Sequence, residues 1–197
     1  MKKFQFSLLV LALLTFIACK DAAEEAGETV EETVKEVEKM VEKPDYAAFD
    51  KNVGVIRAFI AAHEKEDLAA QTALLSDTMS WSPPSYNGNK MQGKTELLAA
   101  LKGYHDSFEN IKFTEGIVTK TGMEPGMWSG SHFPKGSANM SPDAIRVYGT
   151  WTAKHSASGK DIGVKYYAIM WVNSAGKIAG TSTYFDVNGI QAQLKAK

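Results

Sequence analysis

The chain has 197 residues, of which 44% are hydrophobic and 23% charged, and its formal net charge at neutral pH is −1. This balance is typical of a globular protein with a core of ordinary size. Residues 20–43 hold nine acids against four lysines, whereas residues 44–197 hold fourteen acids against sixteen bases. Nucleic acid is not expected as a partner, because its binders usually carry a concentrated basic face.

The amino-terminal residues have the pattern of an export signal. Lys2 and Lys3 precede an apolar run over residues 4–17, which is too short for a membrane-spanning helix of about 20 residues. The run is followed by Cys19, the only cysteine in the chain, so a disulfide within the chain is excluded. Residues 1–18 are therefore predicted to be a removable signal peptide.

The residues Phe16-Ile17-Ala18-Cys19 resemble the lipobox of bacterial lipoproteins, whose cysteine is acylated and becomes the new amino terminus. The resemblance implies that Cys19 carries several acyl chains, palmitate among them, and that the lipid bilayer is a partner. One chain alone would hold the protein only marginally. Lys20-Asp21 and Glu24-Glu25 also resemble the export signal of Bacteroidetes surface lipoproteins.

The expected location is the bacterial cell envelope, with the protein lipid-anchored in the outer membrane. The periplasmic face and the cell surface both remain open. An ordinary secretory signal, with Cys19 present by chance, is the alternative interpretation.

Residues 19–44 are predicted to be an acidic, partly helical tether. Valines recur in this segment at spacings of four, three and four, at Val30, Val34, Val37 and Val41. So narrow an apolar seam is typical of a coiled coil, but it spans only about two heptads. A solvated spacer and a dimerising helix are the two alternatives, and Pro44 ends the segment.

Residues 45–197 are predicted to form one domain, whose first half is helical. Asp45 suits the N-cap of a helix that runs to about Glu66. Its buried stripe consists of Phe49, Val53, Ile56, Phe59, Ile60 and His63. A short helix over Leu68–Leu75 and a brief strand at 78–81 follow. A third helix then runs from Thr95 to about Phe108.

The second half is predicted to be an antiparallel sheet. A strand over residues 111–119 precedes three runs rich in β-branched and aromatic residues, at 144–155, 162–172 and 178–187. The first run should bury Ile145, Val147, Gly149, Trp151 and Ala153. The second run is apolar at both parities, which favours a central strand covered on both faces.

A three-residue hairpin loop should join the last two runs, with Gly176 in the left-handed conformation. Pairing of Asn173 with Lys177 would place Val172 opposite Ile178. The same register would place Tyr166 opposite Tyr184 and Val164 opposite Asp186. Residues 121–143 look instead like a long loop without structure, which is either a lid carrying Trp128 and Phe133 or a mobile insertion.

The order of these elements resembles the nuclear transport factor 2-like fold, and more narrowly its SnoaL-like group. The residues that carry the resemblance are Phe59 to Ala62, Glu66 to Leu68, Leu75 to Asp77, Gly93 to Leu97, Gly149 to Thr152, Gly176 to Ile178, Tyr184 to Asp186, and Gln193-Leu194. The resemblance implies an α+β, cone-shaped domain in which a curved antiparallel sheet wraps around three helices. An apolar pocket then lies at the wide end.

Members of this family include isomerases, epoxide hydrolases, dehydratases and cyclases, and also pocket proteins without a known reaction, so the fold alone does not decide the function. A gapless comparison with ketosteroid isomerase places Phe59, Pro83 and Ala168 where that enzyme has its three polar catalytic residues. Its specific activity is therefore not expected. No cofactor and no metal site are predicted.

Two residues are the candidates for acid–base chemistry. Asp186 is either a general base at the mouth of the pocket or the N-cap of the last helical turn. His63 is either a proton shuttle in the pocket or a hydrogen-bonded core histidine. The side chains expected to line the pocket, or alternatively to serve only as core, are Trp81, Tyr104, Trp151, Tyr167 and Phe185.

The sequence thus predicts a membrane-anchored, extracytoplasmic pocket domain that binds a small apolar or aromatic molecule. A cofactor-independent acid–base enzyme is the first alternative. A protein-interaction module that forms a homodimer through its sheet is the second. At least two titratable groups that converge in one cavity would favour the enzyme.

Overall fold

The computed structural model describes residues 46–129 and 144–196, which belong to the second of the two units into which the chain divides. The predicted signal peptide, Cys19, the predicted tether, the predicted cap at Asp45 and Phe133 lie outside the described residues. Within the described ranges, no helix combines the length and the apolar character that a membrane span requires.

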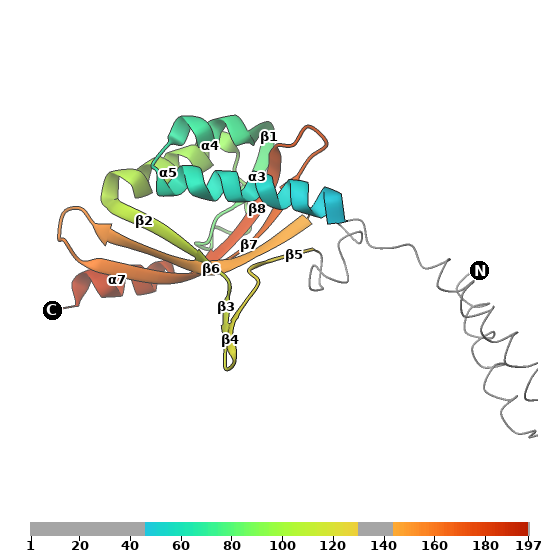
Figure 1. The fold of residues 1–197 in the computed structure, drawn as a ribbon. Coiled ribbons are helices and arrows are strands. Elements are labelled where there is room, and N and C mark those ends of the chain that lie inside the picture. The colour runs from blue at the N-terminus through green and yellow to red at the C-terminus, as the bar shows by residue number, and fades with distance from the viewer. Residues whose placement is uncertain (1–45, 130–143, 197) are drawn as a thin grey trace, which may run out of the picture. The chain divides into compact units, whose positions relative to one another are not determined.

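The domain places three helices on one side of a curved sheet (Figure 1). These helices are α3 (Tyr46–Glu64), α4 (Leu68–Leu74) and α5 (Lys94–Ser107). A further helix, α7 (Val187–Lys195), follows the last strand. The expected α+β class and its curved sheet are confirmed.

The main sheet has the strand order β1-β8-β7-β6-β2, and β5 also pairs with β6. Its strands are β1 (Leu75–Ser82), β2 (Phe108–Glu115), β5 (Met127–Ser129), β6 (Ala144–His155), β7 (Asp161–Val172) and β8 (Ile178–Phe185). All pairs are antiparallel except β1–β8, which is parallel. A separate hairpin of β3 (Ile117–Thr119) and β4 (Gly122–Glu124) projects from the domain (Figure 1).

The start of each helix and its buried face are determined by nearby residues of the sequence. In α3, Phe49, Val53, Ile56 and Ile60 are buried at spacings of four, three and four, as the sequence predicts. Helix α4 begins at Asp67, whose carboxylate accepts a hydrogen bond of 2.8 Å from the Ala70 N–H. At the start of α5, the Glu96 side chain accepts a hydrogen bond from the backbone of Gly93, a residue that has no side-chain cap of its own.

The predicted alternation of β6 is confirmed at Ile145, Val147 and Gly149, all of which are buried. Strand β7 is central, but it is not covered on both faces. Its buried positions share one parity, and Trp171 on the other parity is 40% exposed. The apolar residues of the second parity instead line the outer face of the sheet.

The hairpin between β7 and β8 was predicted correctly only near its turn. The Asn173 N–H donates to the Lys177 carbonyl at 2.9 Å, Gly176 has a φ of 69°, and Val172 lies opposite Ile178. Strand β8 then contains one extra residue, a β-bulge: Trp171 pairs with Gly180, whereas a regular register would pair it with Ala179.

This register shift makes two predicted pairs wrong. Tyr166 lies opposite Phe185, and Tyr184 lies opposite Tyr167. Asp186 faces no β7 residue, since β8 ends one residue earlier. A shift of one residue moves a side chain to the other face of the sheet, so the bulge decides which aromatic residues face inward.

The predicted unstructured loop of 121–143 begins instead with β structure. Strands β4 and β5 occupy its first third, and the predicted long strand of 111–119 is broken at Gly116, which has a φ of 137°. Residues 130–143 lie outside the described ranges. The lid hypothesis therefore stays a prediction.

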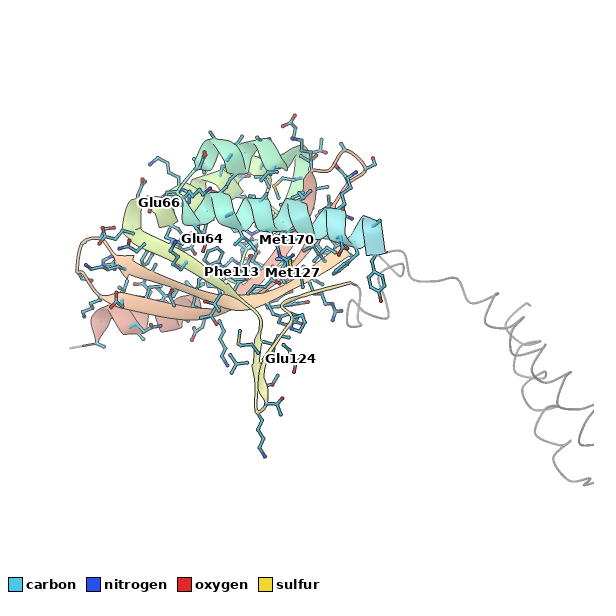
Figure 2. All side chains as sticks on the ribbon, in the orientation of Figure 1. Glu64, Glu66, Phe113, Glu124, Met127 and Met170 are labelled. Carbon is cyan, nitrogen blue, oxygen red and sulfur yellow. The ribbon has the colours of Figure 1, made fainter. Side chains whose placement is uncertain are left out.

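Two polar contacts tie α3 to the edge strand β2. The Arg57 guanidinium donates to both carboxylate oxygens of Glu115, at 2.9 and 2.8 Å. At the last residue of the helix, Glu64 accepts a hydrogen bond of 2.9 Å from the Phe113 N–H, and Figure 2 shows both residues where α3 crosses β2. These contacts fix the helix that carries His63 against the sheet.

Candidate functional site

The space between the helices and the inner face of the sheet contains a cavity of about 240 Å³. Of the three covering helices, α3 and α5 contribute to its wall and α4 does not. The rest of the wall comes from β1, β2, β6, β7, β8 and α7. Most of the lining side chains are aliphatic or aromatic, such as Leu101 on α5 and Met170 on β7. The cavity is therefore an apolar site of the size that accepts a small ligand.

Four of the five aromatic residues predicted to line the pocket do so. Trp81, Tyr104, Trp151 and Phe185 all contribute to the cavity wall. They leave the cavity open, because their rings pack along its sides. Trp81 is fixed by a hydrogen bond of 3.1 Å from its indole N–H to the Thr183 hydroxyl.

Tyr167 was assigned to the wrong face. It lies on the outer face of the sheet, where its ring stacks between Tyr148 and Tyr184 at centroid distances of 4.7 and 5.7 Å. The residue that lines the cavity is its neighbour Tyr166. The period-two alternation Val164–Tyr166–Ala168 carried this information, since both flanking residues are buried.

Tyr166 contributes a hydroxyl group to the cavity wall and is surrounded by aromatic rings. Its ring contacts Phe113, Trp151 and Phe185 at centroid distances of about 6 Å. Its hydroxyl has no hydrogen-bond partner among the described residues, and neither has that of Tyr104. Burial raises the pKa of Tyr166, with a smaller contribution from Tyr104, so the group stays a neutral donor.

A second unpartnered hydroxyl belongs to Thr181, which is 4% exposed and lines the same cavity. Its Oγ1 forms no hydrogen bond in the described part of the chain. A buried polar group without a partner costs about 1–3 kcal/mol. The cavity thus combines an apolar wall with hydroxyl groups that a ligand oxygen can engage.

His63 lies in the cavity wall and contacts a second histidine. Its Nδ1 is 2.8 Å from Nε2 of His105 on α5, and its ring meets the edge of Trp151 at 5.0 Å. The pKa of His63 is lowered to about 4, chiefly by burial and to a smaller extent by the nearby His105. His63 is therefore a neutral imidazole at physiological pH.

The partner of His63 could not be found from sequence. His105 lies 42 residues away on another helix, and its sequence neighbours Asp106 and Glu109 suggest a solvated helix face. Only the packing of α3 beside α5 brings the two rings together. In the described ranges, no three residues among His, Cys, Asp and Glu form a group that could hold a metal ion.

Asp186 does not serve as a general base in the cavity. It is exposed, it is not part of the cavity wall, and its carboxylate accepts a hydrogen bond of 2.7 Å from the Gly189 N–H. It is the N-cap of α7, which is the alternative that the sequence left open. Its role is to start the helix whose Ile190 closes one end of the cavity.

Helix α7 is held to β7 by a reciprocal pair of hydrogen bonds. The Gly163 N–H donates to the Gln193 side chain at 2.9 Å, and the Gln193 amide donates back to the Gly163 carbonyl at 3.0 Å. The Lys160 ammonium also donates to the Leu194 carbonyl at 2.7 Å. These contacts hold the carboxy-terminal half of the helix that carries Ile190.

Comparison with known proteins identifies the fold. No family model matches the sequence, and no curated protein is significantly similar to it. Among solved structures, a candidate isomerase from Bacillus subtilis is similar, with a TM-score of 0.58 at 15% identity over 76% of this chain and 96% of that one. A candidate polyketide cyclase from Xanthomonas campestris pv. campestris gives a TM-score of 0.54 at 13% identity, over 76% of this chain and 100% of that one.

The epoxide hydrolase/cyclase-like enzyme SalBIII of salinomycin biosynthesis is also similar, with a TM-score of 0.53 at 8% identity over 71% of this chain and 94% of that one. Identities this low establish the architecture alone. The domain has the nuclear transport factor 2-like fold that the sequence predicted. Its ligand and its reaction have to be argued from its own residues.

Proposed function

We propose that the domain binds a small, largely apolar molecule in the cavity between the helices and the sheet. The observation that carries this proposal is the cavity of about 240 Å³, with its aliphatic and aromatic wall. An apolar cavity of roughly 150 Å³ is already large enough for benzene. A ligand of one or two rings therefore fits the space available.

The ligand also carries an oxygen function. The hydroxyls of Tyr104, Tyr166 and Thr181 all belong to the wall, and none of them has a hydrogen-bond partner among the described residues. A carbonyl or hydroxyl oxygen placed among them would recover part of the desolvation cost of these groups. A pure hydrocarbon would leave them unpaired and would bind more weakly.

A second candidate function is cofactor-independent acid–base catalysis, and the observation that favours it is His63. This imidazole lies in the wall together with Tyr104 and Tyr166, so several titratable groups converge on one cavity. The candidate cyclase, the candidate isomerase and the epoxide hydrolase/cyclase-like enzyme share this fold. The carboxylate base of ketosteroid isomerase has no counterpart here, because Pro83 stands at its position.

The location proposed for this pocket is the bacterial cell envelope. The lipobox-like sequence that ends at Cys19 supports acylation and anchoring in the outer membrane. Membrane fractionation of cells that express the full chain tests it: the wild type should be in the membrane fraction, and Cys19→Ala should be released. Retention of Cys19→Ala in the membrane would contradict lipid anchoring.

Ligand binding is tested by native mass spectrometry and by calorimetric titration of the full chain with 2-naphthol, which has two rings and one hydroxyl. The mass spectrum also reports whether a homodimer forms. Two adjacent alanines of α5 provide a matched pair of variants. Ala100 lines the cavity, whereas Ala99 is exposed on the same helix.

The substitution Ala100→Leu fills part of the cavity and should weaken binding at least tenfold. Ala99→Leu adds the same side chain on the solvent side and should leave binding unchanged. Equal binding by both variants would place the ligand outside this cavity and would contradict the proposal.

A further inference from the structure

Among the described residues, most of the large apolar side chains that stay exposed lie on two projections of the domain. Tyr86 and Met91 belong to the loop between β1 and α5, and they are 86% and 57% exposed. Val118 and Met123 belong to the β3–β4 hairpin, where they lie directly opposite each other and are 69% and 52% exposed. Exposed apolar groups of this size often mark a surface that meets a partner.

The two projections flank one groove on the outer face of the sheet. The groove has a volume of about 500 Å³, and its wall includes Pro84 of the loop, Val118 of the hairpin and Tyr184 of β8. Figure 1 shows the hairpin on the side of the sheet away from α3. Tyr184 is exposed as well. We call the five exposed side chains the apolar rim: Tyr86, Met91, Val118, Met123 and Tyr184.

The apolar rim adjoins the cavity between the helices and the sheet. Pro84 and Ser85 line that cavity, whereas the next residue, Tyr86, points into solvent. Pro84, Tyr166 and Phe185 contribute both to the cavity and to the outer groove. The loop that carries half of the exposed apolar pairs is therefore also a part of the cavity wall.

Hydrogen bonds hold this loop in its exposed form. At its base, Trp81 and Gln92 exchange two backbone hydrogen bonds of 2.8 Å. At its tip, the Asn87 side chain donates to the Lys90 carbonyl at 2.8 Å and accepts from the Lys90 N–H at 3.0 Å. A fixed backbone thus presents Tyr86 to solvent, so that docking of the loop requires little further ordering.

Lysines flank the apolar rim. Lys90 in the loop, Lys120 at the tip of the hairpin and Lys165 in the wall of the outer groove are all exposed. Within the described ranges, none of the three forms an ion pair. The hairpin also carries Glu124, which Figure 2 shows on the projection. Three lysines against this one carboxylate leave a positive balance beside the apolar side chains.

We propose that the apolar rim docks the domain on the surface of an anionic bilayer. Tyr86, Met91 and Val118 lie at the level of the headgroups, and the lysines face the lipid phosphates. Apolar burial and the attraction of lysines to anionic lipids are the two contributions that bind proteins at this level, and tyrosine is enriched there. In this orientation the cavity wall at Ser85 faces the lipid, from which an apolar ligand has a short path to the cavity.

The shape of the surface favours a bilayer over a protein partner. A stable protein interface buries about 800 Å² on each side in a continuous, complementary area. Here the apolar side chains lie on two separate projections, and fluid headgroups adapt to separate projections more easily than a rigid partner does. The residues involved are distinct from Cys19, so docking adds an orientation to the proposed acyl anchor.

The test places single cysteines in the full chain and labels them with nitrobenzoxadiazole, a dye whose emission shifts to the blue in lipid. Met91→Cys and Val118→Cys report on the two projections. Ala175→Cys is the matched control, because this exposed residue lies in the turn before β8, whereas Tyr184 lies about 20 Å further along that strand. The unsubstituted chain, treated in the same way, gives the background from Cys19.

The vesicles contain phosphatidylcholine and phosphatidylglycerol in equal parts, in excess over the protein. Labels at Met91→Cys and Val118→Cys should shift to the blue and be quenched by nitroxide-bearing lipid, whereas the label at Ala175→Cys should do neither. Rim labels that behave like the label at Ala175→Cys would overturn the proposal. A blue shift without vesicles that grows with protein concentration would overturn it too, because it would show contact between copies of the chain.

A charge test uses two pairs of exposed lysines. With the label at Val118→Cys, Lys90→Gln combined with Lys120→Gln should lower the ratio of docked to undocked label about tenfold or more. Lys51→Gln combined with Lys65→Gln, both on α3, should leave that ratio unchanged. An equal effect of the two pairs would mean that overall charge, rather than this surface, attracts the lipid, and would contradict docking through the apolar rim.

An apolar test asks whether the two projections act together. Val118→Ser combined with Met123→Ser should lower the docked fraction reported by the label at Met91→Cys about tenfold, because the hairpin no longer buries apolar surface in the lipid. An unchanged fraction would remove the hairpin from the docking surface. Circular dichroism establishes that each variant is folded.

Failure of this inference is distinguishable from failure of the other proposals. Titration with 2-naphthol in the absence of vesicles tests the cavity alone, and fractionation of Cys19→Ala tests the acyl anchor alone. Rim labels that remain in water would overturn the docking and leave both of those results unchanged.

Discussion

The two faces of strands β7 and β8 carry nearly the same pair of aromatic rings. On the inner face, Tyr166 lies opposite Phe185 with ring centroids 6.1 Å apart and an interplanar angle of 30°. On the outer face, Tyr167 lies opposite Tyr184 at 5.7 Å and 28°. The inner pair lines the cavity, whereas Tyr184 is 58% exposed.

The comparison teaches that aromatic content alone does not locate a binding site in this fold. Adjacent tyrosines of one strand belong to different environments, because successive side chains of a strand point to opposite faces. The inner face is covered by helices α3 and α5, so its side chains lose water, and the hydroxyls of Tyr166 and Thr181 have no hydrogen-bond partner among the described residues. The outer face keeps its hydroxyls in or near solvent. The covering helices therefore create the site.

The largest expected difference between the faces is in stability. Ile145 on the inner face of β6 is fully buried, and Ile145→Ala should lower the free energy of unfolding by about 2–5 kcal/mol, because it removes apolar burial and leaves a void. Thr150→Ala, on the other parity of the same strand, should change it by about 1 kcal/mol or less. Urea unfolding monitored by circular dichroism measures both. Equal effects would mean that the helices do not cover the inner face as described.

The next effect is sensitivity to acid, which His63 should impart to the inner face. Its pKa is lowered in the folded state from an ordinary 6.5 to about 4, chiefly by burial. Between these values the unfolded chain binds a proton that the folded chain does not. The folded state is therefore destabilised as the pH falls from about 6.5 toward 4. The free energy of unfolding should decrease by roughly 3 kcal/mol over this range because of His63.

The measurement for this prediction is the free energy of unfolding as a function of pH. His63→Leu should flatten its fall between about pH 6.5 and 4 relative to the wild type. A variant that keeps the full slope would show that other groups cause the acid sensitivity, and His63 would then not be desolvated in the cavity wall.

Most of the fold could be predicted from the sequence because its signals are local. The apolar stripe of α3, the cap at Asp67 and the left-handed Gly176 each depend on a few neighbouring residues. The cavity and four of its predicted aromatic residues followed once the order of elements resembled a known fold. The N-cap role of Asp186 was likewise one of the two alternatives that its sequence context offered.

The remainder could not be predicted because it depends on registers and on contacts between distant segments. A single extra residue between Ile178 and Gly180 places Phe185 rather than Tyr184 opposite Tyr166, and no turn signal announces it. The pairing of His63 with His105 arises from the approach of two helices. Parallel pairing of β1 with β8 also joins segments about a hundred residues apart. Periodicity gives the face of each segment, but not these alignments.

A smaller effect on stability is expected from substitutions at two glycines, one in β6 and one in β7. A Cβ added at Gly149 in β6 would meet the Phe113 ring and lie 2.7 Å from the Thr114 carbonyl oxygen. Gly149→Ala should therefore cost about 1–3 kcal/mol and disturb the ring that supports Tyr166. At Gly163 in β7 the nearest atom, Thr152 Cγ2, is 3.8 Å away, so Gly163→Ala should be tolerated. Thermal unfolding of both variants tests the difference, and a tolerated Gly149→Ala would contradict the close packing of β2 on β6.

The smallest effect is the coupling within the two aromatic pairs themselves, measured by double-mutant cycles on urea unfolding. Replacing Tyr166 and Phe185 by leucine, singly and together, measures the inner pair, and the same replacements at Tyr167 and Tyr184 measure the outer one. Similar ring geometry predicts similar coupling, about 0.5–1 kcal/mol in each cycle. The single substitutions should differ much more, since those on the inner face also alter the cavity wall. If the outer pair showed no coupling while the inner pair kept it, the contact of Tyr167 with Tyr184 would be passive, and enclosure by the helices, rather than the pairing of strands, would hold the inner rings together.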